Sequence, residues 1–429
     1  MDSNSPRLNT VQSTFQTYFG KYETPTTTLQ SPLPPEPLYS APLSYWSIAK
    51  KGILDVAALS APFLLIYSIG RFCLSKIAPT VAPRPFPLKV TYALNVLIAL
   101  GAYRIVQAVV GFPVHPAILS WLKGEENLQL YDQLRSLQTG KQMMRISARS
   151  EMGHRIDGVF IKNTGVDLQG RCLLISPPNE ELYENILDSF TELSTELKAN
   201  ILIYNYAGVG RSTGWFPNRD AMAASHKAMR GLLEELESKE ICDFGWSIGG
   251  GVKWQSHAEA PPENPNKYVS IDYQTFRSVA NIGYQILWHF GSWGVSLLQW
   301  NYDNERAIKQ SQCGCIPIDC TGDKLMQEGN RPTEIEKLNE SKIVVERGRH
   351  GSPLDTATIS EIAIKVNAHF SNCVNVHLAS APDNQDVTEN SSEGLHREDL
   401  PISQNDSLQQ AGDQSVSIDE HLRNCQELD

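Results

Sequence analysis

The pattern of apolar and polar positions divides the chain into four stretches. Residues 1–45 are rich in Ser, Thr, Asn, Gln and Pro, residues 46–125 hold two long apolar segments, and residues 380–429 are polar and acidic. Between them, residues 143–375 alternate short apolar runs with amphipathic segments. A polar stretch buries too little apolar surface to offset the entropy lost on ordering it. We therefore predict disordered ends, an apolar helical region and one globular domain.

The globular stretch has the alternation of a mostly parallel α/β sheet. Short apolar runs that are typical of buried strands alternate with segments whose apolar residues recur at helical spacing. The predicted strands are two runs within 145–161, then 172–175, 201–206, 240–246, 268–273, 316–320 and 342–345, and the predicted helices include 182–197, 220–236 and 359–370. Right-handed crossovers between parallel strands place helices on both faces of such a sheet.

The two apolar segments lie at 53–77 and 90–112, and the second apolar run continues to residue 122. A helix that spans a bilayer needs about 20 apolar residues, so the second qualifies only if Arg104 is accommodated. One interpretation is a pair of buried helices that cap the globular core. The other is a membrane-embedded pair, which the position of both segments outside the globular pattern favours. It predicts a membrane-associated protein, with its topology left open.

Charge and cysteine content narrow the class of protein. The net charge is −11, but residues 381–429 hold twelve acidic residues and two arginines, which leaves about −1 for the rest. A near-neutral domain offers no basic surface for nucleic acid. Eight cysteines in 429 residues do not form a disulfide scaffold. Three of them cluster without paired Cys-x-x-Cys spacing, so we interpret them as strand residues and not as a zinc site: Cys313, Cys315 and Cys320.

One predicted strand ends in Gly245-Trp246-Ser247-Ile248-Gly249, followed by two more glycines. This is the spacing of a nucleophile elbow, in which a strand turns sharply into a helix and exposes one serine. The residues two before and two after that serine must be small, because strand and helix cross there. Gly245 and Gly249 meet this requirement, so Ser247 is the candidate nucleophile. The Gly-x-Ser-x-Gly motif alone is common by chance. It indicates a serine hydrolase only if an acid and a histidine follow later in the chain.

A serine hydroxyl becomes a nucleophile when a histidine takes its proton and a carboxylate orients that histidine. After a nucleophile elbow the acid comes next in the chain and the histidine last, each on a loop after a strand. Asp323 follows the strand 316–320, and His350 follows the strand 342–345. We predict these two as acid and base, in preference to Asp319, which lies within its strand. The competing histidines precede the acid and are out of order: His257 and His289.

An oxyanion hole needs two backbone N–H groups. Ile248, directly after the nucleophile, is placed to supply one. The other must come from the loop after strand 172–175, where Pro177 and Pro178 have no N–H to donate. This leaves Asn179 or Glu180 as the second donor, and we select Asn179.

Three motifs resemble a branch of the α/β-hydrolase superfamily. They are Asn-Glu-Glu-Leu-Tyr-Glu at 179–184, Tyr-Asn-Tyr-Ala-Gly-Val-Gly-Arg-Ser-Thr-Gly at 204–214 and Trp-Ser-Ile-Gly-Gly at 246–250. The branch includes membrane-anchored phosphatidylserine lipases of animals and uncharacterised chlamydia-type relatives. The resemblance covers roughly residues 143–370 and implies an α/β-hydrolase fold. The sequence departs from the pattern at Ser176-Pro177-Pro178, where relatives usually have a glycine before the asparagine.

Together these features predict a serine hydrolase that cleaves a lipid or other acyl ester through an acyl-enzyme, without a metal or organic cofactor. A serine peptidase or a thioesterase would use the same triad. A catalytically silent hydrolase fold that serves as a membrane-tethered interaction module is the alternative outside enzymes. The complete triad argues against silence, whereas the prolines in the oxyanion loop leave this alternative open. The oligomeric state does not follow from the sequence.

Residues 278–302 contain no Asp, Glu, Lys or Arg but hold several large aromatic residues. They fall between the strand 268–273 and the strand that leads to Asp323, where hydrolases of this fold commonly insert a lid. Two interpretations stay open: a buried core helix, and a lid that faces both a lipid and the active site.

Overall fold

The computed structural model describes residues 11–17, 36–77, 87–110, 142–179, 181–214, 217–338 and 340–380. The predicted acidic tail lies outside these residues beyond Ser380, and so does the end of the second apolar run, 111–122.

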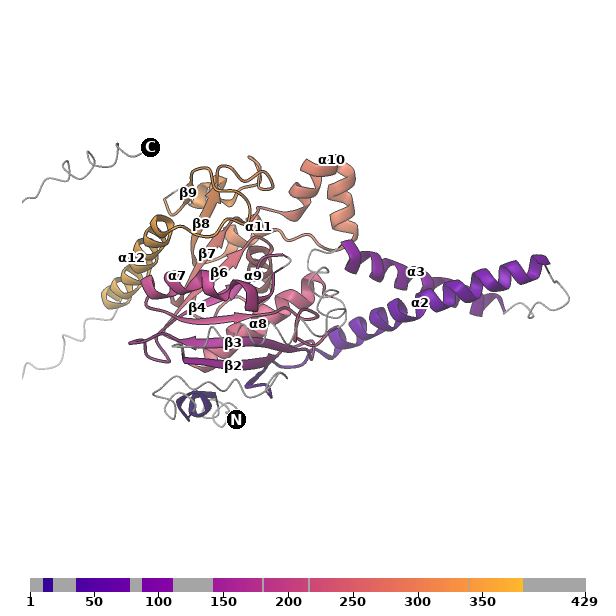
Figure 1. Cartoon of the computed structure of the whole chain (residues 1–429), viewed down its shortest axis with the longest axis horizontal. Coiled ribbons are helices and arrows are strands. Elements are labelled where there is room, and N and C mark those ends of the chain that lie inside the picture. The colour runs from indigo at the N-terminus through magenta and orange to yellow at the C-terminus, as the bar shows by residue number, and fades with distance from the viewer. Residues whose placement is uncertain are drawn as a thin grey trace, which may run out of the picture. The chain divides into compact units, whose positions relative to one another are not determined.

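Within the described residues, nine strands form one sheet in the order β1-β2-β3-β5-β4-β6-β7-β8-β9 (Figure 1). Their bounds are Tyr39–Ser40, Gln142–Arg149, Arg155–Lys162, Arg171–Ser176, Asn200–Tyr204, Glu240–Trp246, Tyr268–Tyr273, Gly314–Cys320 and Ile343–Val345 for β1 to β9. β3 is antiparallel to both β2 and β5, and all other neighbours are parallel. The predicted fold class, an α/β-hydrolase fold with a mostly parallel sheet, is confirmed.

Helices cover both faces of the sheet, because strand residues that alternate in the sequence point to opposite faces. Leu174 of β4 packs with α8 (Arg219–Glu235) and α9 (Ile248–Glu259), whereas its neighbour Leu173 packs with α6 (Tyr183–Ile186), α7 (Thr191–Glu196) and α12 (Thr356–Ser380). Two further helices, α10 (Val279–Leu297) and α11 (Asn304–Gln310), lie between β7 and β8 in the chain.

The predicted helix 182–197 is interrupted in the structure. A 3₁₀ turn, Leu187–Phe190, separates α6 from α7. A 3₁₀ turn has three residues per turn, so positions three apart align on one side. This brings Leu187, Phe190 and Leu193 onto the buried face together. The apolar positions were therefore predicted correctly, but the continuity of the helix was not.

Part of the N-terminal segment that we predicted to be disordered is ordered. Residues 11–17 form a helix in which Val11 and Phe15 are buried, and the Phe15 ring meets that of Phe160 edge-on at 5.0 Å. Residues 39–40 add strand β1 beside β2. The prediction of disorder was wrong for these residues. Two apolar residues four positions apart, Val11 and Phe15, are too weak a helical signal to notice in a segment that is otherwise polar.

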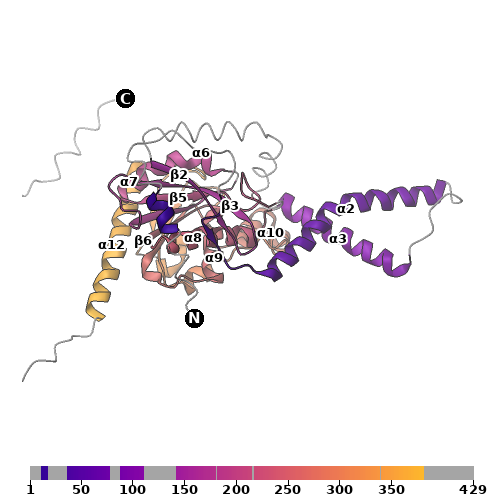
Figure 2. The same ribbon diagram turned by 90° about the horizontal axis from the view of Figure 1, so that it is seen from below.

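The apolar region forms two helices, α2 (Tyr45–Ile77) and α3 (Leu88–Val110), which lie side by side in Figures 1 and 2. They approach closely at small residues, since a Cβ atom on Gly101 would lie 2.2 Å from the carbonyl oxygen of Ala57. Residues Tyr45–Leu74 are long and apolar enough to cross a membrane, and only 17% of their most apolar 18-residue stretch is buried. A pair of buried capping helices therefore does not describe α2.

Candidate active site

The turn between β6 and α9 has the geometry of a nucleophile elbow. Ser247 stands alone between the two elements, with φ 53° and ψ −117°, a strained conformation for a residue with a side chain. A Cβ atom on Gly245 would lie 2.5 Å from the Cα of Gly250, and one on Gly249 would lie 2.1 Å from the carbonyl oxygen of Ser176. Both flanking positions therefore require glycine, because strand and helix cross too closely for a side chain.

Ser247, His350 and Asp323 form one chain of hydrogen bonds. Ser247 Oγ lies 3.1 Å from His350 Nε2, and His350 Nδ1 lies 2.7 Å from Asp323 Oδ2. The three residues follow β6, β9 and β8, so they meet at the carboxyl edge of the parallel strands. Each side chain is thus carried by a separate strand exit, as the sequence predicted.

The carboxylate of Asp323 is fixed on both oxygens. Oδ2 faces His350, and Oδ1 accepts hydrogen bonds from the backbone N–H groups of Leu325 at 2.8 Å and Met326 at 3.0 Å. Burial by itself raises the pKa of Asp323, but these hydrogen bonds, that from His350 foremost, lower it below its usual value. The carboxylate therefore stays ionised at neutral pH and stabilises a positive charge on the imidazole.

The loop that carries His350 is held by Gln274, which sequence reasoning missed. Gln274 directly follows β7, is fully buried and has φ 49°. Its Oε1 accepts a hydrogen bond from the Gly351 N–H at 2.7 Å, and its Nε2 donates to the Arg349 carbonyl at 2.7 Å. Its Oε1 also accepts from Trp246 Nε1 at 3.3 Å. The side-chain amide of Gln274 is thus hydrogen-bonded to both neighbours of His350 and to Trp246, the residue before Ser247.

The predicted oxyanion donors follow the carboxyl ends of β6 and β4, which are parallel neighbours in the sheet. Ile248 is the first residue of α9, and the loop with Asn179 follows β4, whose last residue, Ser176, abuts Gly249. Asn179 Oδ1 is buried without a hydrogen-bond partner among the described residues. Glu180, the other donor that we considered, lies outside them.

The competing residues take part in other contacts. Asp319 lies buried in β8, where its Oδ2 accepts a hydrogen bond from the Thr333 hydroxyl, and burial raises its pKa to about 6. His257 Nε2 donates a hydrogen bond to Asp243 Oδ2 at 2.8 Å, and burial lowers the pKa of His257 to about 4. His289 is exposed on α10. The clustered cysteines border or belong to β8 and form no disulfide: Cys313, Cys315 and Cys320.

A second polar cluster lies in the core, between β6 and the helices α8 and α9. Asp243 Oδ2 is 3.1 Å from His226 Nε2 and 2.8 Å from His257 Nε2, a donor set of the kind that holds a metal ion. The Lys253 ammonium donates to the Asp243 carbonyl at 2.8 Å. A positive charge so close would repel a metal ion bound at this site. We interpret the cluster as a hydrogen-bonded network that joins the two helices to the sheet.

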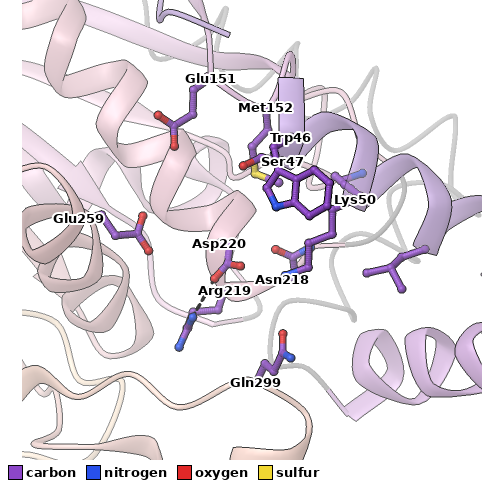
Figure 3. Close-up of a pocket in the computed structure, with 12 residues that line it drawn as sticks. Trp46, Ser47, Lys50, Glu151, Met152, Asn218, Arg219, Asp220, Glu259 and Gln299 are labelled. Atoms are coloured by element: carbon purple, nitrogen blue, oxygen red, sulfur yellow. Dashed lines mark hydrogen bonds and ion pairs between the residues drawn. The ribbon is translucent and has the colours of Figure 1, made fainter. Parts of the chain in front are cut away.

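A cavity of about 270 Å³ lies where the start of α2 meets the turn between β2 and β3 (Figure 3). Its lining mixes acidic and basic side chains, and Arg219 pairs with Asp220 within it. None of Ser247, Asp323 and His350 lines this cavity, so it is separate from the candidate active site. The residues labelled in Figure 3 include Trp46, Lys50, Glu151, Asn218, Glu259 and Gln299.

A family model described as Chlamydia CHLPS protein (DUF818) matches residues 87–371. An esterase from Pyrococcus furiosus is similar in structure, with a TM-score of 0.42 and 15% identity over 55% of this chain and 92% of its own. An esterase from Pyrobaculum calidifontis gives 0.39 and 12% over 58% and 92%, and an α/β serine hydrolase without a lid from Xanthomonas campestris gives 0.34 and 14% over 56% and 97%. No curated protein matches the sequence. At these identities and TM-scores the likeness does not extend to a function or a substrate.

Proposed function

We propose that this chain, which belongs to the family described as Chlamydia CHLPS protein (DUF818), is a serine hydrolase that cleaves a carboxylic ester. The observation that carries the proposal is the chain of hydrogen bonds from Ser247 through His350 to Asp323, at 3.1 and 2.7 Å. Nucleophile and base are within reach of proton transfer, and the base is oriented by a carboxylate that stays ionised.

In the first half of the reaction, Ser247 Oγ attacks the ester carbonyl carbon while His350 Nε2 takes its proton. The resulting oxyanion is stabilised by the backbone N–H of Ile248, and we assign the second donor to Asn179. Collapse of this intermediate breaks the ester C–O bond, and the leaving alkoxide takes the proton from His350. The acyl group stays on Ser247.

In the second half, water attacks the acyl-enzyme and gives a proton to His350 Nε2. Collapse releases the carboxylic acid and returns the proton to Ser247 Oγ. Asp323 stabilises the imidazolium ion in both halves without itself taking a proton. His350 thus passes on each proton that it takes, first to the leaving alkoxide and then to Ser247.

A lipid ester is the substrate class that we favour. Support comes from the apolar exposed surface of α2 and from the resemblance of three motifs to phosphatidylserine lipases. Such a substrate places the protein at a membrane, with α2 as its anchor. A peptidase or thioesterase would use the same residues, and only substrate assays separate the three.

A fluorophosphonate probe on the full chain tests the proposal. The wild type should be labelled, and Ser247→Ala should abolish labelling and the hydrolysis of short p-nitrophenyl esters. Because the removed hydroxyl lies at a strained turn and leaves little space behind, the variant should retain the melting temperature of the wild type. Labelling that survives Ser247→Ala would place the nucleophile elsewhere. A wild type that folds but is never labelled would favour the silent interaction module.

A further inference from the structure

Helix α10 folds back on itself. Leu287 (φ −133°, ψ 23°) and Trp288 (φ 50°, ψ −140°) are not helical, and Figure 1 shows two helical arms joined at a bend. The arms touch at two glycines, since a Cβ atom on Gly291 would lie 1.9 Å from the carbonyl oxygen of Gly283. The segment is therefore a short helical hairpin, and we call residues 286–290 at its bend the α10 apex.

The α10 apex exposes large apolar side chains. Trp288 is 73% exposed and Phe290 is 82% exposed, and Trp293 on the second arm is 65% exposed. Trp300, at the end of the same charge-free stretch, is buried. Trp300 belongs to the core but lies beyond the end of α10, and the exposed apex shows that a buried core helix does not describe α10.

The base of the hairpin is hydrogen-bonded to the segment that follows the proposed catalytic acid. Asn330, in the segment that follows Asp323, accepts hydrogen bonds from the Arg277 N–H on its carbonyl at 2.8 Å and from the Ser278 N–H on its side chain at 3.2 Å. α10 also follows the carboxyl end of β7, at the edge of the sheet where Ser247 lies. The hairpin thus rises from the rim of the candidate active site.

The C-terminal end of α10, at the end of its second arm, is in contact with the apolar helix pair. The Tyr103 hydroxyl of α3 donates a hydrogen bond to the Leu297 carbonyl at 2.8 Å. α3 packs against α2, which is long and apolar enough to cross a membrane. α10 is therefore in contact with the helix pair to which the proposed membrane anchor, α2, belongs.

The chemistry of the apex favours lipid over protein as the occupant. Protein interfaces surround an apolar centre with a polar, charged rim, whereas residues 278–302 carry no charge. Tryptophan is the side chain enriched at the boundary between water and hydrocarbon. We propose that the α10 apex inserts into the interface of a lipid bilayer and so brings lipid esters to the rim of the active site. The delivery of substrate rests on the proposed function, but the insertion does not.

Fluorescence quenching tests the insertion on the full chain. Phosphatidylcholine vesicles with brominated acyl chains quench tryptophans that enter the bilayer. Replacing Trp288 and Trp293 together by Phe should remove part of the quenched emission, whereas Trp300→Phe, the matched buried control, should remove none. Quenching that is unchanged in the double variant would overturn the proposal, and so would an apex variant that alters only self-association.

Activity tests the delivery of substrate. Replacing Trp288 and Phe290 by Ser should lower turnover of a vesicle-embedded ester by about tenfold or more, because less apolar surface is transferred into the bilayer. Turnover of a soluble short-chain ester should change by less than about twofold, because no residue of the catalytic chain is altered. Ile364→Ser, which removes an exposed apolar residue from α12, should affect neither. Equal losses on both esters would refute delivery by the apex. A failed fluorophosphonate test together with intact quenching would refute the proposed function and leave the insertion standing.

Discussion

Gln274 offers the sharpest test of how the base is held in place. Gln274→Glu keeps the size of the side chain and the oxygen that accepts from the Gly351 N–H. It replaces Nε2, the donor to the Arg349 carbonyl at 2.7 Å, by an oxygen. The partly buried Arg349 carbonyl, which accepts the shortest hydrogen bond from Nε2, then loses its donor and faces a second acceptor, which costs about 1–3 kcal/mol. If the whole of this free energy acts on the position of His350, kcat/KM should fall by roughly 5- to 150-fold.

The pH dependence of the Gln274→Glu variant separates positioning from general damage. When the introduced carboxyl group is protonated, its O–H can again donate to the Arg349 carbonyl. The ratio of the variant's kcat/KM to that of the wild type should therefore rise as the pH falls. The assay is p-nitrophenyl ester hydrolysis by the full chain, with melting temperatures measured at each pH. Gln327→Glu, an exposed substitution of the same charge in the segment after Asp323, is the control. A Gln274→Glu variant with wild-type kcat/KM at every pH would refute the reasoning.

The remaining predictions concern the acid, the base and a buried carboxyl group. Asp323→Asn and His350→Ala should each lower kcat by about 10³–10⁴, and the double variant by little more, because triad members act as a unit. Asp319→Asn, the control, should stay near wild type in p-nitrophenyl ester turnover. If Asp319→Asn is inactive and Asp323→Asn is near wild type, Asp319 and not Asp323 is the catalytic acid. Burial raises the pKa of Glu184 from 4.5 to about 7, so the folded state binds this proton more tightly than the unfolded state does, and stability is lost as the pH rises through this window. Relative to wild type, the unfolding free energy of Glu184→Gln in urea should rise between pH 4.5 and 7 by up to about 3 kcal/mol, and a difference that does not vary with pH would contradict the assignment.

The parts of the fold that the sequence predicted are those that depend on local order. The strands that precede Ser247, Asp323 and His350 are short apolar runs, and the order of the three residues can be read directly along the chain. Gly245 and Gly249 signal the sharp turn because no other residue fits where strand and helix cross.

The parts that the sequence did not predict depend on contacts between distant segments. A glutamine after a strand carries no pattern, and the role of Gln274 exists only because the fold brings residues 349–351 to it. His226 and His257 meet Asp243 from two different helices, so their spacing does not reveal the cluster. The reversal of α10 depends on a tryptophan with positive φ, which residue preferences argue against.

Strand β1 has a consequence for how far the domain can move. Residues 39–40 are hydrogen-bonded to the edge of the sheet, and only the four residues 41–44 separate them from α2. Four residues span at most about 15 Å when fully extended. With α2 in a bilayer, this short linker would keep the domain close to the bilayer surface. The enzyme would then search for substrate in two dimensions, and its rate would follow the surface density of the ester and not its bulk concentration.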